Sequence, residues 1–359
     1  MEKNPEKGSL GSSFPPLSMG LNLPNWLVNT TYTVVGIVSL VLVLLYKYQN
    51  SLLYFPDIPG MPYHKPSENP EGYRNPGDAS SEQVPYENVL VETADGEKVH
   101  TWLMLQKENP ENKPTLIYFH GNAGNMGFRL PNSVNMYLRT GMNILTMDYR
   151  GYGDSTGVPD ENGLDLDAEA VLQHALKHPK LTNSPMILFG RSLGGAVAVS
   201  LAHRHPKEVS AIIVENTFLS ISAMVDVLIP WVAFAKDLVL RIGWDSESKI
   251  QDLECAMMFI SGDADELVPP PQMKKLLDLA AKSCFKDFYS VSGGGHNDSF
   301  IKAGMEYYKR LRMFAARDEI MMSRGGKAVL AAECDEGEAP ALVQQEKALP
   351  TMQTNFEVK

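Results

Sequence analysis

Residues 186–203 read MILFGRSLGGAVAVSLAH: an apolar strand pattern, a short turn and a helix pattern rich in Ala and Val. The turn carries Ser192 in a Gly-x-Ser-x-Gly pentapeptide. Glycines on both sides permit the sharp strand-to-helix turn that holds a serine exposed in a strained conformation. The pentapeptide is common by chance, but its place between a strand and a helix is typical of a nucleophile elbow. We therefore predict that Ser192 is a nucleophile.

A serine nucleophile needs a general base, and the strongest candidate is His296. It follows three consecutive glycines, which come after the last predicted strand, residues 288–291. Small residues let the backbone bring an imidazole across to the serine. We therefore predict that His296 is the base.

The base needs a carboxylate to orient it, and three acids compete for that role. The predicted strand 256–260 is followed by GDADELVP, which contains Asp263, Asp265 and Glu266. The D-x-x-V-P form favours Asp265, and turn propensity accounts for Asp263. Asp265 is the predicted third member of the triad.

An oxyanion hole is expected from two backbone N–H groups. One belongs to Leu193, directly after the nucleophile. The other arises from HGNAGN, which follows the predicted strand 115–119. Asn122 is the expected donor in this loop, with Ala123 as the alternative.

The other polar motifs are weaker indications of chemistry. His120 is expected to be structural, hydrogen-bonded within its loop. The glycines of DYRGYGDS, residues 148–155, suit a tight turn near the site. His174 and His178 are four apart, but Ala175 occupies the general-base position of the H-E-x-x-H zinc motif. No metal or cofactor is expected.

Strand and helix patterns alternate over the domain that we place at residues 88–318. Near-continuous apolar strands alternating with helices indicate a mostly parallel sheet with helices on both faces. A hairpin signal precedes this alternation, and an apolar helical insert, residues 218–250, interrupts it. The insert can be a lid over the site, which could also touch lipid, or an excursion packed on the core. The predicted strands are 89–92, 99–105, 115–119, 143–147, 186–189, 211–214, 256–260 and 288–291.

The N-terminal part contains 39 consecutive uncharged residues between Lys7 and Lys47. Residues 26–46 are long enough for about 31 Å of helix, which spans a bilayer. Trp26 and Tyr46 lie near its ends, where aromatic rings favour the headgroup level. A cleaved signal peptide is disfavoured because no small-residue cleavage site follows, and a buried core helix is disfavoured because the segment has no polar face. The flanking lysines leave the orientation nearly even.

The remaining segments frame the anchor and the domain. Residues 1–25 form an N-terminal tail, and residues 47–87 form a connector that contains seven prolines and is wrapped or extended. Residues 319–359 carry 7 acidic and 4 basic residues and are expected to be disordered.

The overall composition limits the possible partners. The net charge of −11 argues against binding to nucleic acid. The 3 cysteines are too few for a disulfide framework. The expected partners are the bilayer and an acyl-ester or acyl-thioester substrate, for which a lipid is one candidate. The oligomeric state stays open.

Four long motifs carry a family resemblance: HGNAGNMGFRLPN, MDYRGYGDSTG, LFGRSLGGAVAVSLA and IIVENTFLSI. With them, residues 51–314 resemble the membrane-anchored α/β-hydrolase domain-containing protein 13-like (Bem-type) family of serine hydrolases. The resemblance implies the α/β-hydrolase fold, with Ser192, Asp265 and His296 on the triad positions. It also implies a single-pass type II topology with a lumenal or extracellular catalytic domain. The sequon at Asn297 agrees with that side, although its place beside His296 could leave it unused.

These observations predict a membrane-anchored serine hydrolase that cleaves an ester or thioester through an acyl-enzyme. One alternative is a protein depalmitoylase, an acyl-protein thioesterase. The other is a membrane-tethered scaffold that retains the hydrolase fold without turnover.

Overall fold

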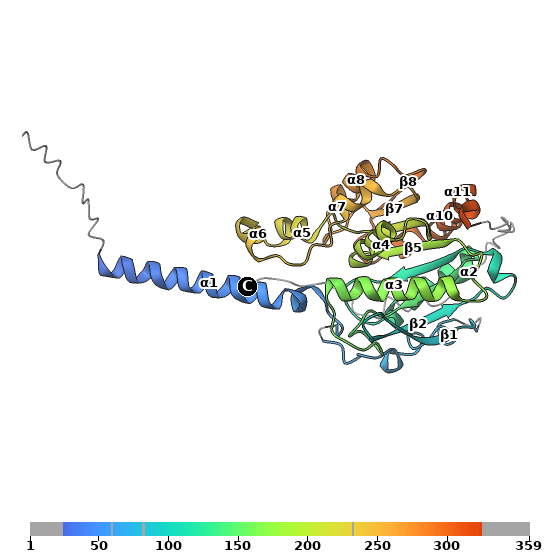
Figure 1. Cartoon of the computed structure of the whole chain (residues 1–359), viewed down its shortest axis with the longest axis horizontal. Helices are drawn as coiled ribbons and strands as arrows, with labels where there is room; N and C mark the ends of the chain where they lie inside the picture. Colours follow the sequence, from blue (N-terminus) through green and yellow to red (C-terminus); the bar gives the residue numbers. More distant parts are fainter. Residues whose placement is uncertain (1–23, 59, 81–82, 232, 325–359) are drawn as a thin grey trace, which may run out of the picture. The chain divides into compact units, whose positions relative to one another are not determined.

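The computed structural model describes residues 24–58, 60–80, 83–231 and 233–324. The chain divides into two compact units, Met1–Lys47 and Tyr48–Lys359. The first contains most of a long helix, and the second contains the sheet (Figure 1).

Eight strands form one sheet in the order β1-β2-β4-β3-β5-β6-β7-β8. β2 is antiparallel to both β1 and β4, and the other neighbouring pairs are parallel. This arrangement confirms the predicted mostly parallel sheet and its leading hairpin. The strands are β1 Glu87–Glu92, β2 Lys98–Met104, β3 Thr115–Phe119, β4 Asn143–Met147, β5 Met186–Arg191, β6 Val209–Glu215, β7 Ala256–Gly262 and β8 Lys286–Val291.

Helices cover both faces of this sheet because the buried strands present apolar side chains on each face. The core on one face includes Leu172 of α3, Val197 of α4 and Leu276 of α8. The core on the other includes Val134 of α2 and Leu311 of α10. The α-helices are α1 Asn25–Leu53, α2 Leu130–Thr140, α3 Glu161–Lys177, α4 Leu193–Arg204, α5 Ile221–Leu228, α6 Lys236–Val239, α7 Ser246–Lys249, α8 Pro270–Leu279, α9 Ser299–Ala303, α10 Met305–Ala315 and α11 Asp318–Met321. The 3₁₀ helices are η1 Pro66–Glu68, η2 Pro110–Asn112, η3 Met126–Arg129, η4 Ala233–Ala235, η5 Ile250–Asp252 and η6 Met322–Arg324.

The N-terminal helix α1 is long and apolar enough to cross a membrane. No residue of its most apolar window is buried, which differs from the core helix of a soluble protein. The helix continues beyond the predicted end at Tyr46 and stops at Leu53, so the start of the predicted connector is helical.

The rest of the connector wraps the domain instead of extending freely. Tyr54, Ile58, Tyr73 and Val84 are buried. Ile58 and Tyr73 pack with Phe128 in a small apolar cluster of their own. Proline ends helices and limits ladder pairing, so this segment packs through side chains and turns.

The tail and the insert differ from the sequence prediction. The disordered tail predicted from Glu319 is wrong at its start, because α11 and η6 continue the chain and bury Ile320 and Met321. Residues 325–359 of that tail and residues 1–23 lie outside the described residues. The insert is helical, as predicted, but broken into the short pieces α5, η4, α6 and α7.

Candidate active site

The strand-to-helix turn at Ser192 has the predicted nucleophile-elbow geometry. Ser192 lies between β5 and α4 with φ 55° and ψ −122°, a conformation that non-glycine residues rarely adopt. A Cβ atom on Gly190 would lie 2.0 Å from the carbonyl oxygen of Gly194. A Cβ atom on Gly194 would lie 2.1 Å from the carbonyl oxygen of Phe119 at the end of β3. Both glycines of the pentapeptide are therefore required by close backbone contacts.

The loop after β3 lies beside the nucleophile. A Cβ atom on Gly121 would be 3.7 Å from Cβ of Ser192. Leu193 is the first residue of α4, so its N–H group has no acceptor within the helix. Within the described residues, neither the Asn122 nor the Ala123 N–H has a backbone acceptor outside the helices and strands. Both remain candidates for the loop donor, with Asn122 as the prediction.

His296 and Asp265 are brought together by the loops after β8 and β7. Nδ1 of His296 lies 2.9 and 3.1 Å from the two carboxylate oxygens of Asp265. Both side chains are buried, and the carboxylate also accepts the backbone N–H groups of Leu267 and Val268 at 2.9 Å. Two backbone N–H groups therefore hold the Asp265 carboxylate in the position from which it orients the imidazole of His296.

Neither competing acid bonds to His296 in the described part of the chain. Asp263 accepts the Gly293 N–H at 2.6 Å and so fastens the glycine turn that precedes His296. A Cβ atom on Gly295 would be 3.1 Å from Oε2 of Glu266. Of the three predicted candidates, Asp265 alone bonds to His296 within the described residues.

The hydroxyl of Ser192 forms no hydrogen bond with His296 among the described contacts. Such catalytic contacts are often long without substrate and tighten in the Michaelis complex. Their neighbours in the sequence are nevertheless bonded to each other. The guanidinium of Arg191, which precedes Ser192, donates to the carbonyl of Asn297, which follows His296, at 3.0 Å.

Asn216 links the two loops that carry the acid and the base. Its Nδ2 donates to the carbonyls of Gly295 and His296, both at 3.0 Å. Its Oδ1 accepts the N–H of Gly262 at 2.8 Å, at the start of the acid loop. Asn216 has φ 47°, in the left-handed region, where asparagine is better tolerated than most residues. The Asn216 amide therefore helps to set the spacing between the Asp265 and His296 loops, together with the Ala264 N–H, which donates to the Gly294 carbonyl at 2.9 Å.

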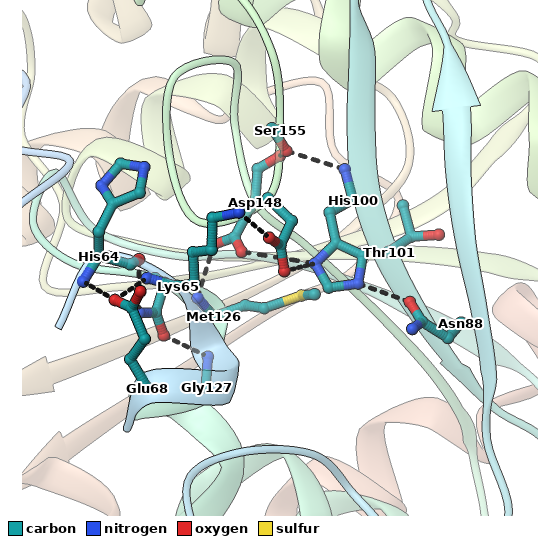
Figure 2. Close-up of polar contacts among 12 residues, drawn as sticks. His64, Lys65, Glu68, Asn88, His100, Thr101, Met126, Gly127, Asp148 and Ser155 are labelled. Atoms are coloured by element: carbon teal, nitrogen blue, oxygen red, sulfur yellow. Dashed lines mark hydrogen bonds and ion pairs between the residues drawn. The ribbon is translucent and has the colours of Figure 1, made fainter. Parts of the chain in front are cut away.

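Asp148 and His100 belong to a buried polar cluster (Figure 2). Oδ1 of Asp148 accepts the Met126 N–H at 2.6 Å and lies 3.7 Å from Nε2 of His120. Oδ2 of Asp148 lies 4.0 Å from Nδ1 of His100. Nδ1 of His120 lies 2.7 Å from the Gly121 carbonyl, which agrees with the structural role predicted for His120.

This cluster is uncharged at neutral pH. Burial raises the pKa of the Asp148 carboxyl to about 8, and Asp154 contributes in the same direction. Burial lowers the pKa of His120 to about 3, aided by Arg129. The contact between Asp148 and His120 therefore joins a protonated acid to a neutral imidazole. The loop after β3 therefore contacts this neutral pair, and the guanidinium of Arg129 also donates to its Ala123 carbonyl.

The sequence did not single out Asn216, and it gave the 148–155 turn only an architectural role. The turn does hold Asp148, and Gly153 is essential to it, because a Cβ there would be 2.1 Å from Oδ2 of Asp148. A signal for Asn216 was available in its place directly after β6, next to the nucleophile strand. Its hydrogen bonds to residues about 80 positions later had no signal in the sequence.

Asn216→Gly is expected to slow acylation of Ser192 at least about tenfold, because misplacing the base by a fraction of an ångström reduces the rate strongly. Glycine keeps the left-handed backbone and removes only the amide. The measurement is the second-order rate of labelling by a fluorophosphonate. Asn135→Ala is the control, because it removes another buried amide, on α2; equal rates in the two variants would contradict the linking role.

The Asp148→Asn variant is expected to lose less unfolding free energy than the wild type as the pH rises. The folded carboxyl keeps its proton to about pH 8 while the unfolded one ionises near 3.8, so wild-type stability falls between these values. Below pH 6.5 His120 acts oppositely, because only its unfolded form takes up a proton. Because both proteins contain His120, its effect cancels in their difference. The unfolding free energy of the variant relative to wild type should therefore rise by about 1.4 kcal/mol per pH unit above pH 3.8 and level off as the pH approaches 8. Urea denaturation measures it, and a constant difference would refute the buried neutral acid.

Comparison with known proteins agrees with this architecture. Residues 110–244 match the family model described as serine aminopeptidase, S33. The chain is 38% identical over 278 residues to protein bem46 of Schizosaccharomyces pombe, covering 77% of this chain and 88% of that protein. It is 34% identical to the α/β-hydrolase domain-containing protein WAV2 of Arabidopsis thaliana, covering 76% and 89%. A Saccharomyces cerevisiae relative, described as an uncharacterized membrane protein, is 34% identical, covering 78% and 93%.

Solved structures show the same fold at low identity. The esterase Pf2001 of Pyrococcus furiosus superposes with a TM-score of 0.54 at 18% identity, covering 73% of this chain and 96% of that one. An acylaminoacyl peptidase of Pyrococcus horikoshii gives 0.52 at 14% identity, covering 70% and 43%. Together with the identity to bem46 over most of both chains, the sheet and the Ser192 turn show that this chain belongs to the Bem46 family of α/β-hydrolases.

Proposed function

We propose that this α/β-hydrolase is a membrane-anchored serine hydrolase that cleaves an ester or thioester through an acyl-enzyme. The observation that carries the proposal is the pair of contacts between the Asp265 carboxylate and Nδ1 of His296. Asn216 fastens the two loops to each other, and Arg191, which directly precedes the strained turn of Ser192, bonds to Asn297 beside His296.

The proposed reaction begins when Ser192 attacks the substrate carbonyl carbon. Nε2 of His296 accepts the hydroxyl proton, and Asp265 stabilises the imidazolium that forms. Backbone N–H groups of Leu193 and of Asn122, or Ala123, hold the oxyanion. The leaving alcohol or thiol takes the proton from His296 as the tetrahedral intermediate collapses. Water, activated by His296, then releases the acid and frees Ser192.

Ser192→Ala is expected to abolish labelling of the full-length protein by a fluorophosphonate, because the probe bonds to the nucleophilic oxygen. His296→Gln should slow labelling at least about a thousandfold, since it removes the general base. Ser200→Ala, which removes a buried hydroxyl on α4, is the matched control and should label normally. Labelling that persists in the Ser192→Ala protein would refute the assignment of the nucleophile.

The anchoring part of the proposal rests on α1. Its apolar window is unburied, and the yeast relative is described as a membrane protein. The family resemblance favours a type II orientation with the catalytic domain on the lumenal or extracellular side. The sequon asparagine, Asn297, is exposed, although the hydroxyl-bearing Ser299 is buried.

The expected orientation predicts protection of the catalytic domain in sealed microsomes. Protease added outside should leave residues 54–324 intact until detergent opens the vesicle. An immunoblot for the domain with and without detergent measures this protection. Digestion of the domain in sealed vesicles would place it on the cytosolic side and overturn the type II proposal, leaving the hydrolase assignment intact.

A further inference from the structure

The insert between β6 and β7 exposes a group of large apolar side chains. Leu228 is 53% exposed, Trp231 66%, Phe234 82% and Leu238 76%. We call these four residues the apolar face of the insert. α5 and α6, which carry part of it, project from one end of the catalytic domain (Figure 1). An exposed group of large apolar side chains marks a surface that binds another protein or a membrane.

The rest of the insert is firmly held, so the exposure is not that of a loose loop. Ala235, which follows Phe234, and Val239, which follows Leu238, are buried. Lys236 bonds to both carboxylate oxygens of Asp226 at 2.6 Å, which joins α6 to α5. At the end of the insert, Glu161 accepts the N–H groups of Gly243 and Trp244 at 2.6 and 2.8 Å. The apolar face is therefore presented on a fixed scaffold.

The same insert is bound to the last turns of α1. Oε1 of Gln49 accepts the N–H groups of Arg241 and Ile242 at 2.8 and 3.1 Å. Its Nε2 donates to the Val239 carbonyl at 3.2 Å. The uncharged run of α1 ends at Tyr46, three residues earlier, so Gln49 is about 5 Å further along the helix. The insert is thus bonded to the chain directly after the apolar run.

The segment after Gln49 continues into the candidate active site. The Tyr54 hydroxyl accepts Nε1–H of Trp244 at 2.9 Å. Asn122 donates from its side chain to the Leu53 carbonyl at 2.8 Å and accepts the Phe55 N–H at its own carbonyl at 2.9 Å. Residues 49–55 therefore connect the insert to the loop that holds the proposed oxyanion donor.

We propose that the apolar face of the insert enters the surface of the bilayer that α1 spans, so that the site takes acyl substrates from that bilayer. This inference rests on the proposed membrane-anchored hydrolase function. Trp and Phe favour the interfacial region, and amphipathic elements bury their apolar side about 5–10 Å into it. The ionic groups nearby leave no net charge, because Asp226 and Asp237 balance Lys236 and Arg241. Insertion depends on apolar contact, not on anionic lipid.

The depth of the insert can be measured with spin labels on the full chain in phosphatidylcholine nanodiscs. Cys255, Cys284 and Cys334 are replaced by serine, and a nitroxide is attached at Phe234→Cys. Collisions with oxygen should exceed those with a water-soluble nickel chelate. Met313→Cys on α10, also exposed but at the other end of the domain, is the control and should show the reverse. A water-like profile at position 234 would overturn the proposal, as would shielding from both reagents, which would indicate a second copy of the chain.

Turnover tests the consequence for the substrate. The Phe234→Asp, Leu238→Asp double variant should lower hydrolysis of a bilayer-embedded acyl ester, relative to a soluble short-chain ester, about tenfold. Met313→Asp should leave the ratio unchanged, and an unchanged ratio in the double variant would overturn the proposal.

Fluorophosphonate labelling of the same discs separates the two hypotheses. Absent labelling with a lipid-like spin-label profile would refute the hydrolase and keep the docking, whereas normal labelling with a water-like profile would do the opposite.

Discussion

The strained backbone at Ser192 is the constraint around which the catalytic domain is built. A serine with φ 55° persists only when the surrounding structure holds its backbone in that conformation. Gly190 and Gly194 provide that approach, so α4 begins directly against the end of β3. The turn thereby brings three things into one small volume: the hydroxyl, the N–H of Leu193 and the loop after β3.

Neutral hydrogen bonds support this geometry on two sides of the site, beside the ionic contacts of Arg191 and Asp263. Asn216 spaces the loops of Asp265 and His296, and it does so with an amide whose hydrogen-bonding pattern does not change with pH. The protonated Asp148 supports the opposite side of the site through the Met126 N–H. A charged support so deep in the core would carry a large desolvation penalty. The Asp265 carboxylate differs, because two backbone N–H groups and His296 surround it.

The exit of α1 is part of the catalytic domain. Gln49, Tyr54 and Phe55 bond to the insert and to the loop after β3, so the chain that leaves the apolar helix also shapes the site. The residues just beyond the apolar run are therefore part of the framework of the site.

Short-range chemistry explains what the sequence alone determined. The alternating strands and helices, the elbow at Ser192, the glycine turn before His296 and the apolar run of α1 each depend on neighbouring residues, so their patterns are visible locally. The tertiary structure decided features that depend on distant residues. It distinguished Asp265 from Asp263 by the atom each carboxylate bonds, gave Asn216 its partners and bound Gln49 to an insert 190 positions later. It also buried Ile320, beyond the boundary that composition suggested. The polar side chains of Asp265, Asn216 and Gln49 carry no periodic signal, because their roles come from the groups that folding places around them.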